Sequence, residues 1–77
     1  MEINDSLTVR VGRFIRKSRT EMGLTGAQLA ELMNISQQQI SRYETARSNL
    51  NLEQLDDLLC VLDKSWRQLI DAVEADF

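Results

Sequence analysis

GAQLAELMNISQQQISRYET, residues 26–45, is the stretch that decides the fold. Apolar residues recur in it at helical spacing on both sides of Asn34, a residue type that tolerates a positive φ and so suits a tight turn. These positions are Leu29, Ala30, Met33, Ile35, Ile40 and Tyr43. Two short helices that pack across a tight turn need this pattern, with a small residue such as Ala30 at their closest approach. Residues 26–45 are therefore predicted to form a helix-turn-helix.

The second of these helices has a polar outer face. If Ile40 and Tyr43 point inward, the side chains that point outward near the helix start are Gln37, Gln38, Ser41 and Arg42. The start of the second helix of a helix-turn-helix is the end that enters the major groove of DNA. A glutamine amide offers a donor and an acceptor side by side, which match N6 and N7 of adenine, and arginine pairs with guanine or phosphate. These four residues are the candidates for reading bases, and the alternative is a merely solvated helix face.

Helix starts are marked by capping boxes, in which a Ser or Thr side chain and a Gln three residues later bond to each other's backbone N–H. Thr25 with Gln28, Ser36 with Gln39 and Ser65 with Gln68 match the box, and Asn51 with Gln54 is a looser version. Helices are therefore predicted to begin near residues 26, 37, 52 and 66. Gln39 is interpreted as a cap and not as a base-reading residue.

A further helix is predicted from about Leu7 to Met22, ended by Gly23. Its apolar stripe leaves four cations on other faces, namely Arg10, Arg13, Arg16 and Lys17. Two interpretations stay open for them, a solvated helix face and a face turned to phosphate. Arg16 and Lys17 are the candidates for contacts with the DNA backbone.

The C-terminal part carries two apolar stripes. In the helix from about residue 52 the stripe is Leu52, Leu55, Leu59 and Leu62; in the helix over about 66–76 it is Trp66, Leu69, Ile70 and Val73. Trp66 and Leu69 are expected to close the core, while Val73 and Phe77 lie beyond the part that the core needs. Five helices make one compact all-α domain over residues 1–77.

One small domain buries only about 600–1,000 Å² on DNA, so a specific complex is expected to need a two-fold dimer. The candidates for the dimer surface are Val73, Phe77, Leu58 and Val61. For Phe77 a frayed chain end is the alternative.

Composition excludes several classes of function. The chain has one cysteine, Cys60, and no histidine, which leaves no internal disulfide and no usual zinc ligand set. No apolar run approaches the ~20 residues that span a membrane, and no secretion signal is recognisable. There is no His-based catalytic pairing and no glycine loop for phosphate. We expect a cytoplasmic protein that is not an enzyme and binds no metal, cofactor, small molecule or membrane.

Charge is unevenly placed along the chain. Residues 1–47 hold seven Lys/Arg and five Asp/Glu, a net charge of +2, whereas residues 48–77 hold two and seven, a net charge of −5. One end of the molecule is therefore suited to phosphate although the whole chain carries −3.

The chain resembles the lambda-repressor/Cro-like family of helix-turn-helix regulators, also called the xenobiotic response element (XRE) family. The resemblance runs through VGRFIRKSRTEMGLTGAQLAELMNISQQQISRYETA, residues 11–46, and SNLNLEQLDDLLCVLDKSWRQLI, residues 48–70. It implies a five-helix fold and a regulator that binds double-stranded DNA. Within the family, the stretches LTGAQLA and ISQQQISRYE resemble the MrpJ-like regulators, which are encoded with fimbrial operons. This resemblance implies fimbrial and motility genes as targets.

The resemblance also implies roles for single residues. Arg19 and Glu44 match an ion pair that ties the first helix to the end of the recognition helix. In addition to Arg16 and Lys17, four residues match family positions that contact the DNA backbone: Ser36, Thr45, Arg47 and Asn49. Two positions depart from the family pattern, because Gly26 replaces the usual glutamine and Ala46 the usual glycine.

Two other functions remain open. An antitoxin of the same fold would use the acidic half of the chain to bind a basic toxin, and a neighbouring reading frame for such a protein would support it. A purely protein-binding module would have no DNA affinity even at low salt.

Overall fold

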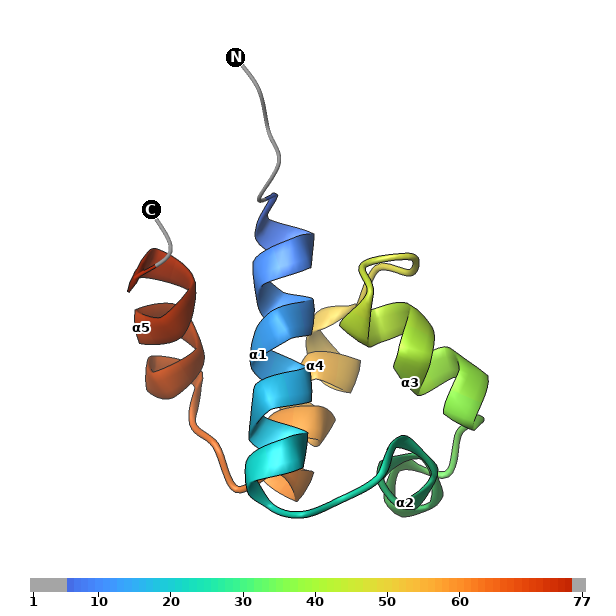
Figure 1. Ribbon diagram of the computed structural model, residues 1–77. Helices are drawn as coiled ribbons and strands as arrows, with labels where there is room; N and C mark the ends of the chain where they lie inside the picture. Colours follow the sequence, from blue (N-terminus) through green and yellow to red (C-terminus); the bar gives the residue numbers. More distant parts are fainter. Residues whose placement is uncertain (1–5, 76–77) are drawn as a thin grey trace.

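The computed structural model describes residues 6–75 and contains five α-helices in that range. They are α1 (Leu7–Glu21), α2 (Gly26–Met33), α3 (Gln37–Glu44), α4 (Leu52–Val61) and α5 (Trp66–Ala75). In Figure 1, α1 runs through the middle, α5 lies on one side, α2 and α3 lie on the other, and α4 lies behind α1. α1 packs against α3 and α5, while α2 packs against α3 and α4. The predicted all-α, five-helix fold is confirmed.

The predicted capping boxes are formed at three helix starts. Reciprocal side-chain bonds join Thr25 with Gln28, Asn51 with Gln54, and Ser65 with Gln68. At α3 the Ser36 hydroxyl accepts from the backbone N–H of Gln39 at 3.0 Å, but the described residues show no return bond from the Gln39 side chain. Gln39 is therefore not a reciprocal cap, and Ser36 alone caps α3.

The two predicted turn residues have the left-handed backbone that their types favour. Gly23 follows α1 with φ 75°, and Asn34 separates α2 from α3 with φ 58°. α1 ends at Glu21, one residue before the predicted end, and Met22 is its C-cap. These two turns set the path of the chain from α1 into the helix-turn-helix.

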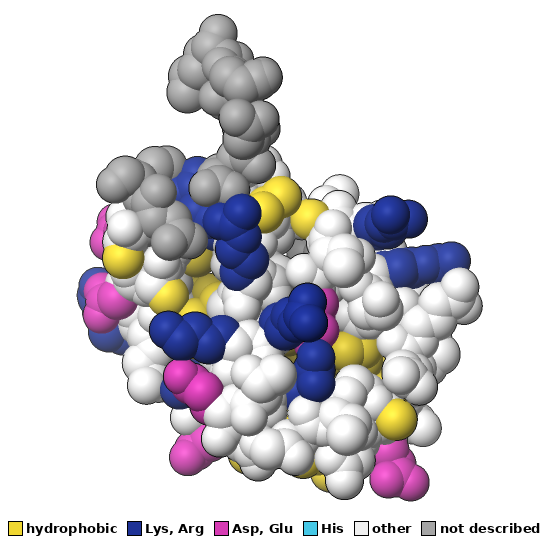
Figure 2. Space-filling view, in the orientation of Figure 1, with side chains coloured by type: hydrophobic (Ala, Val, Ile, Leu, Met, Phe, Trp, Pro, Cys, Tyr) yellow, Lys and Arg dark blue, Asp and Glu magenta, His cyan; other side chains and the backbone are white. Residues whose placement is uncertain are grey.

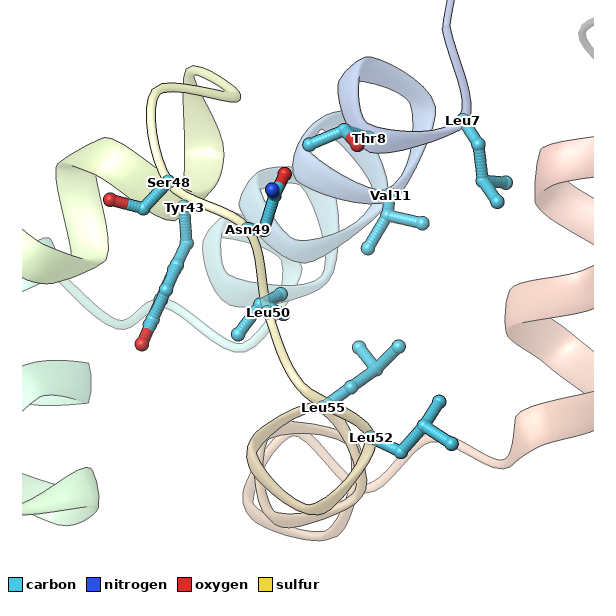
Figure 3. A pocket seen from close by; sticks show the side chains of 9 residues that line it. All are labelled: Leu7, Thr8, Val11, Tyr43, Ser48, Asn49, Leu50, Leu52 and Leu55. Carbon is cyan, nitrogen blue, oxygen red and sulfur yellow. The ribbon is translucent and has the colours of Figure 1, made fainter.

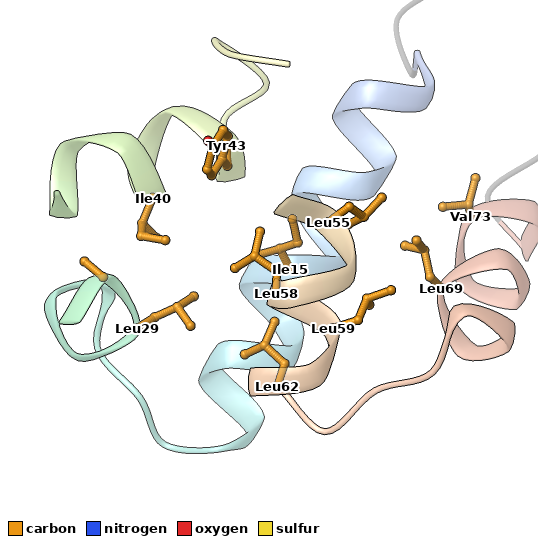
Figure 4. Close-up of a cluster of buried hydrophobic side chains, with 11 residues drawn as sticks. Ile15, Leu29, Ile40, Tyr43, Leu55, Leu58, Leu59, Leu62, Leu69 and Val73 are labelled. Atoms are coloured by element: carbon orange, nitrogen blue, oxygen red, sulfur yellow. The ribbon is translucent and has the colours of Figure 1, made fainter. Parts of the chain in front are cut away.

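The core lies between all five helices (Figure 4). Its fully buried apolar side chains are Ile15, Leu29, Ile40, Leu58, Leu59 and Leu62. In α4 the buried positions 55, 58, 59 and 62 follow the i, i+3, i+4, i+7 pattern. The predicted stripe began one turn too early, since Leu52 is 74% exposed.

Two residues of the predicted dimer surface are buried within the single chain. Leu58 is 0% and Val73 is 8% exposed, because both side chains belong to the buried core cluster (Figure 4). Val61 is partly buried against the same core. Phe77 lies outside the described residues. The larger exposed apolar side chains of this region are instead Leu52, Trp66 and Ile70.

Arg10 is buried, contrary to the expectation of a solvated or phosphate-facing side chain. It is 8% exposed, and its Nη1 donates to the carbonyl oxygen of Val73 at 3.3 Å. Val73 lies in the last turn of α5, where carbonyls have no partner within the helix and a cation is favourable. Arg10 therefore attaches the end of α5 to α1.

Gly12 brings α1 and α3 into backbone contact, a feature that the sequence did not reveal. A Cβ atom at Gly12 would lie 2.7 Å from the carbonyl oxygen of Tyr43 and 2.8 Å from that of Glu44. No real side chain fits at these distances without a shift of the backbone. The missing side chain thus fixes how closely α3 approaches α1.

Candidate nucleic-acid interface

α3 is held by two side chains of its inner face. Ile40 and Tyr43 are buried three residues apart, so the opposite face must point outward. The four side chains predicted to read bases are all exposed there: Gln37, Gln38, Ser41 and Arg42. The geometry of the helix agrees with the sequence prediction for this face.

Two hollows flank this outer face and share Ser41 and Thr45. One, of about 340 Å³, is lined by Gln38, Ser41, Arg42, Thr45 and Arg47. The other, of about 260 Å³, lies where α1, α2 and α3 meet and includes Arg16, Gly26 and Gln37 among its lining residues. Seven of the residues predicted to contact DNA therefore lie on one surface. Figure 2 shows Lys and Arg side chains across α1 and beside the C-terminal end of α3 on this view of the molecule.

Arg19 connects α1 to the C-terminal end of α3 through a bidentate ion pair with Glu44. Its Nε donates to Oε2 of Glu44 at 2.6 Å, its Nη2 donates to Oε1 at 3.0 Å, and its Nη1 donates to the Leu24 carbonyl at 2.8 Å. The hydrogen bonds that Arg19 donates to the Glu44 carboxylate raise the pKa of Arg19. Since all three bonds are internal, they hold the guanidinium of Arg19 in place and position α3 against α1.

A helix-turn-helix family model matches residues 15–69, most of the chain. The chain belongs to the XRE-type helix-turn-helix family. Its members are DNA-binding transcription regulators, and this is the class in which the protein falls. A comparison with curated proteins found no match.

Solved structures of two regulators are similar to this helix-turn-helix protein. The clp gene regulator ClgR from Corynebacterium glutamicum is 24% identical, with a TM-score of 0.85 over 91% of this chain and 90% of that chain. The wild-type restriction-modification controller protein C.Esp1396I is 26% identical, with a TM-score of 0.83 over 94% of this chain and 92% of that one. The likeness to ClgR shows the fold.

The loop after α3 departs from the family pattern at Ala46, which has φ 60°. This left-handed conformation is strained for alanine and easy for glycine. The chain nevertheless turns there, because Arg47 N–H donates to the Arg42 carbonyl at 2.8 Å and Thr45 Oγ1 donates to the Ser41 carbonyl at 2.7 Å. The turn places Arg47 beside the outer face of α3.

Three residues predicted to contact the DNA backbone lie outside the two hollows. Lys17 lines a hollow between α1 and α5 with Ala72 and Ala75. Asn49 lies across the loop from the outer face of α3, in an apolar groove of about 410 Å³ beside Thr8 (Figure 3). Ser36 is exposed at the N-cap of α3. Among the cations predicted to contact the DNA backbone, Arg16 and Arg47 are therefore the two that share a hollow with predicted base-reading residues.

Gly26 belongs to this site, although the sequence analysis noted it only as a departure from the family pattern. It lines the hollow of about 260 Å³ and lies next to Gln37. Within residues 6–75, no group of three or more metal-ligating side chains comes together, and no helix has the length and apolar character to cross a membrane.

Proposed function

We propose that this protein binds specific double-stranded DNA sites as a homodimer and regulates transcription by inserting α3 into the major groove. The observation that carries the proposal is the exposed polar face of α3, flanked by Arg16 and Arg47, in a chain of this family. An anchored helix with a polar outer face and cations at its edges suits both base reading and phosphate contact.

Gln37 and Gln38 are proposed to read adenine, and Arg42 to read guanine or grip phosphate. Ser41 is proposed to make a peripheral base contact. Contacts with the DNA backbone are assigned to Thr45, Arg16 and Arg47, which line the two hollows, and to Ser36, which is exposed at the N-cap of α3 itself. Lys17 and Asn49 line other hollows and are not assigned such contacts. Such contacts set the register on the duplex without carrying sequence information.

The dimer surface is proposed to lie on α4 and α5. Trp66 and Ile70 are exposed one helical turn apart, and Trp66 Nε1 donates to Asp56 Oδ1 of α4 at 2.8 Å. That bond fixes the indole against α4, and Leu52 is exposed one turn before Asp56. Exposed apolar side chains gathered in this way are typical of a protein interface. This surface replaces the one predicted around Leu58 and Val73.

The finer target is proposed from the resemblance of LTGAQLA and ISQQQISRYE to MrpJ-like regulators. We infer that the genes controlled are fimbrial and motility genes, and that the protein acts in the bacterial cytoplasm. Repression by exclusion of polymerase and activation by contact with it both fit this geometry.

In vitro selection of bound duplexes from a random DNA pool tests the proposal. We expect a two-fold symmetric motif whose half-sites are about 34 Å apart, with adenine-containing steps in each half. A pool that stays random after repeated rounds with folded protein would contradict sequence-specific DNA binding.

An antitoxin is the second candidate, favoured by the acidic side chains around the apolar ones on α4 and α5. Asp56, Asp57, Asp71 and Glu74 are exposed there. This surface suits a basic protein partner as well as a second copy. Co-purification with a small basic protein encoded by a neighbouring reading frame would support the antitoxin, and a homodimer that binds DNA without it would favour the regulator.

A further inference from the structure

The side chain of Gln37 lies against a position that has no side chain. Gly26 is the first residue of α2, and a Cβ atom built on it would lie 3.8 Å from Cγ and 3.9 Å from Nε2 of Gln37. No other atom of a neighbouring helix would lie within 4 Å. Gln37 thus borders a hollow of about 260 Å³ that the missing side chain helps to keep open.

Within the described residues, no hydrogen bond holds the amide of Gln37. Two other side chains that line this hollow are held by hydrogen bonds, because Thr45 Oγ1 donates to the Ser41 carbonyl oxygen and Arg19 donates to Glu44. A glutamine side chain with free space beside it keeps several rotamers, and it loses that freedom when it pairs with a base. An unheld amide also presents either its oxygen or its nitrogen, so it pairs with more than one base edge.

The backbone of Gly26 does not itself require glycine. Among the glycines of the described residues, only Gly23 has a left-handed backbone, so the φ of Gly26 lies outside that region. The contacts of 3.8 and 3.9 Å are ordinary van der Waals distances, so alanine fits there without a shift. The fold therefore tolerates a side chain at this position, and the main effect of glycine is on the space around Gln37.

We propose that Gly26 is a specificity-determining residue, which relaxes the base preference of Gln37 by leaving its side chain room to lie over the start of α2. The inference rests on the proposed function, because it assumes that Gln37 reads a base. A longer side chain at position 26 fills the hollow and restricts Gln37 to orientations that point toward the groove. The restriction raises the preference for one base pair at the position that Gln37 contacts.

The test compares Gly26→Leu and Gly26→Ala with the unchanged protein. The selected DNA site is varied through all four base pairs at each position, and the position read by Gln37 is the one at which Gln37→Ala removes the preference. We expect Gly26→Leu to raise the ratio of dissociation constants at that position by about fivefold or more, and Gly26→Ala to raise it less. Ala27→Leu is the matched control, because Ala27 is exposed and does not line the hollow.

The double variants decide between the inference and a general effect on binding. In a Gln37→Ala background, Gly26→Leu is expected to leave every base preference unchanged. An unchanged ratio in Gly26→Leu, an equal loss of affinity for all sites, or the same rise without the Gln37 amide would overturn the inference. If thermal unfolding shows that the leucine variant does not fold, the ratio in Gly26→Ala decides alone. An unchanged protein that does not distinguish selected from random DNA would instead overturn the proposed function.

Discussion

At the scale of single residues, the position of the recognition helix depends on an absent side chain. Gly12 lets the backbone of α1 touch the carbonyl oxygens of Tyr43 and Glu44, at the end of α3. Helix interiors ordinarily favour alanine over glycine by about 1 kcal/mol. The contact with α3 outweighs that preference here, because the helix-turn-helix must pack close to α1.

Gly12→Ala is therefore expected to lower the free energy of unfolding by about 2 kcal/mol, within the usual cost of overpacking. Gly26→Ala is the matched control, since a Cβ atom there meets only ordinary contacts. It is expected to raise the free energy of unfolding by about 0.5 kcal/mol through the unfolded state. Urea denaturation of both variants measures the difference, and equal effects at the two glycines would refute the close contact at Gly12.

At the scale of elements, α3 is tied to α1 by the ion pair of Arg19 and Glu44. Both side chains are largely shielded from solvent, at 14% and 8% exposed, so the pair is less screened than a surface pair. Removal of one partner would leave the other without its hydrogen bonds, which costs more than the net value of the pair.

Arg19→Ala is expected to lower the free energy of unfolding by about 2 kcal/mol, within the range for lost hydrogen bonds to a charged group. Arg67→Ala serves as the control, because its pair with Asp71 is exposed and 3.8 Å long, and such pairs contribute about 0.5 kcal/mol or less. Thermal unfolding of the two variants checks this. A smaller effect for Arg19 than for Arg67 would show that the pair does not hold α3.

The elements also show what could be predicted from the sequence. Helix starts and turns were predictable because caps and left-handed residues act within four residues of the chain, as at Thr25 and Asn34. The outer face of α3 followed from its own apolar spacing. The direction of other side chains depends on helices far along the chain. The buried Arg10 donates to a carbonyl oxygen of α5, and Gly12 matters because α3 reaches it.

At the scale of the whole molecule, the charges are unevenly distributed between the two halves of the chain. Arg16 and Arg47 border the outer face of α3, whereas most carboxylates of residues 48–77 lie on α4 and α5. A protein that carries a net −3 can bind DNA in this way, because phosphate meets only its basic end.

Arg47→Ala is expected to weaken binding to selected and random DNA alike, and to reduce the slope of log affinity against log salt by about 1. Arg67→Ala is the control, because it removes the same charge from α5, where the Arg67 side chain is 75% exposed. It is expected to leave the slope unchanged. Fluorescence anisotropy titrations over a range of salt concentrations measure both slopes. An unaltered slope in Arg47→Ala would exclude a phosphate contact.

The proposed dimer is also a property of the whole molecule. Ile70→Glu places a charge in the apolar surface of α4 and α5, and it is expected to shift a dimer to monomer at micromolar concentration, since an unpaired charge in an interface is costly. Leu32→Glu is the control, because Leu32 is a large exposed apolar residue on α2. Analytical ultracentrifugation reads out both. A dimer that survives Ile70→Glu but not Leu32→Glu would move the interface to α2.

The most direct measurement of base reading by α3 is the affinity of Gln38→Ala for the selected site and for a random duplex at the same salt concentration. Gln38 is exposed and lies beside Arg42 and Arg47 on the outer face. The expected result is a loss of about 1–3 kcal/mol on the selected site and almost none on random DNA, with unchanged thermal unfolding. An equal loss on both duplexes would contradict base reading by this helix.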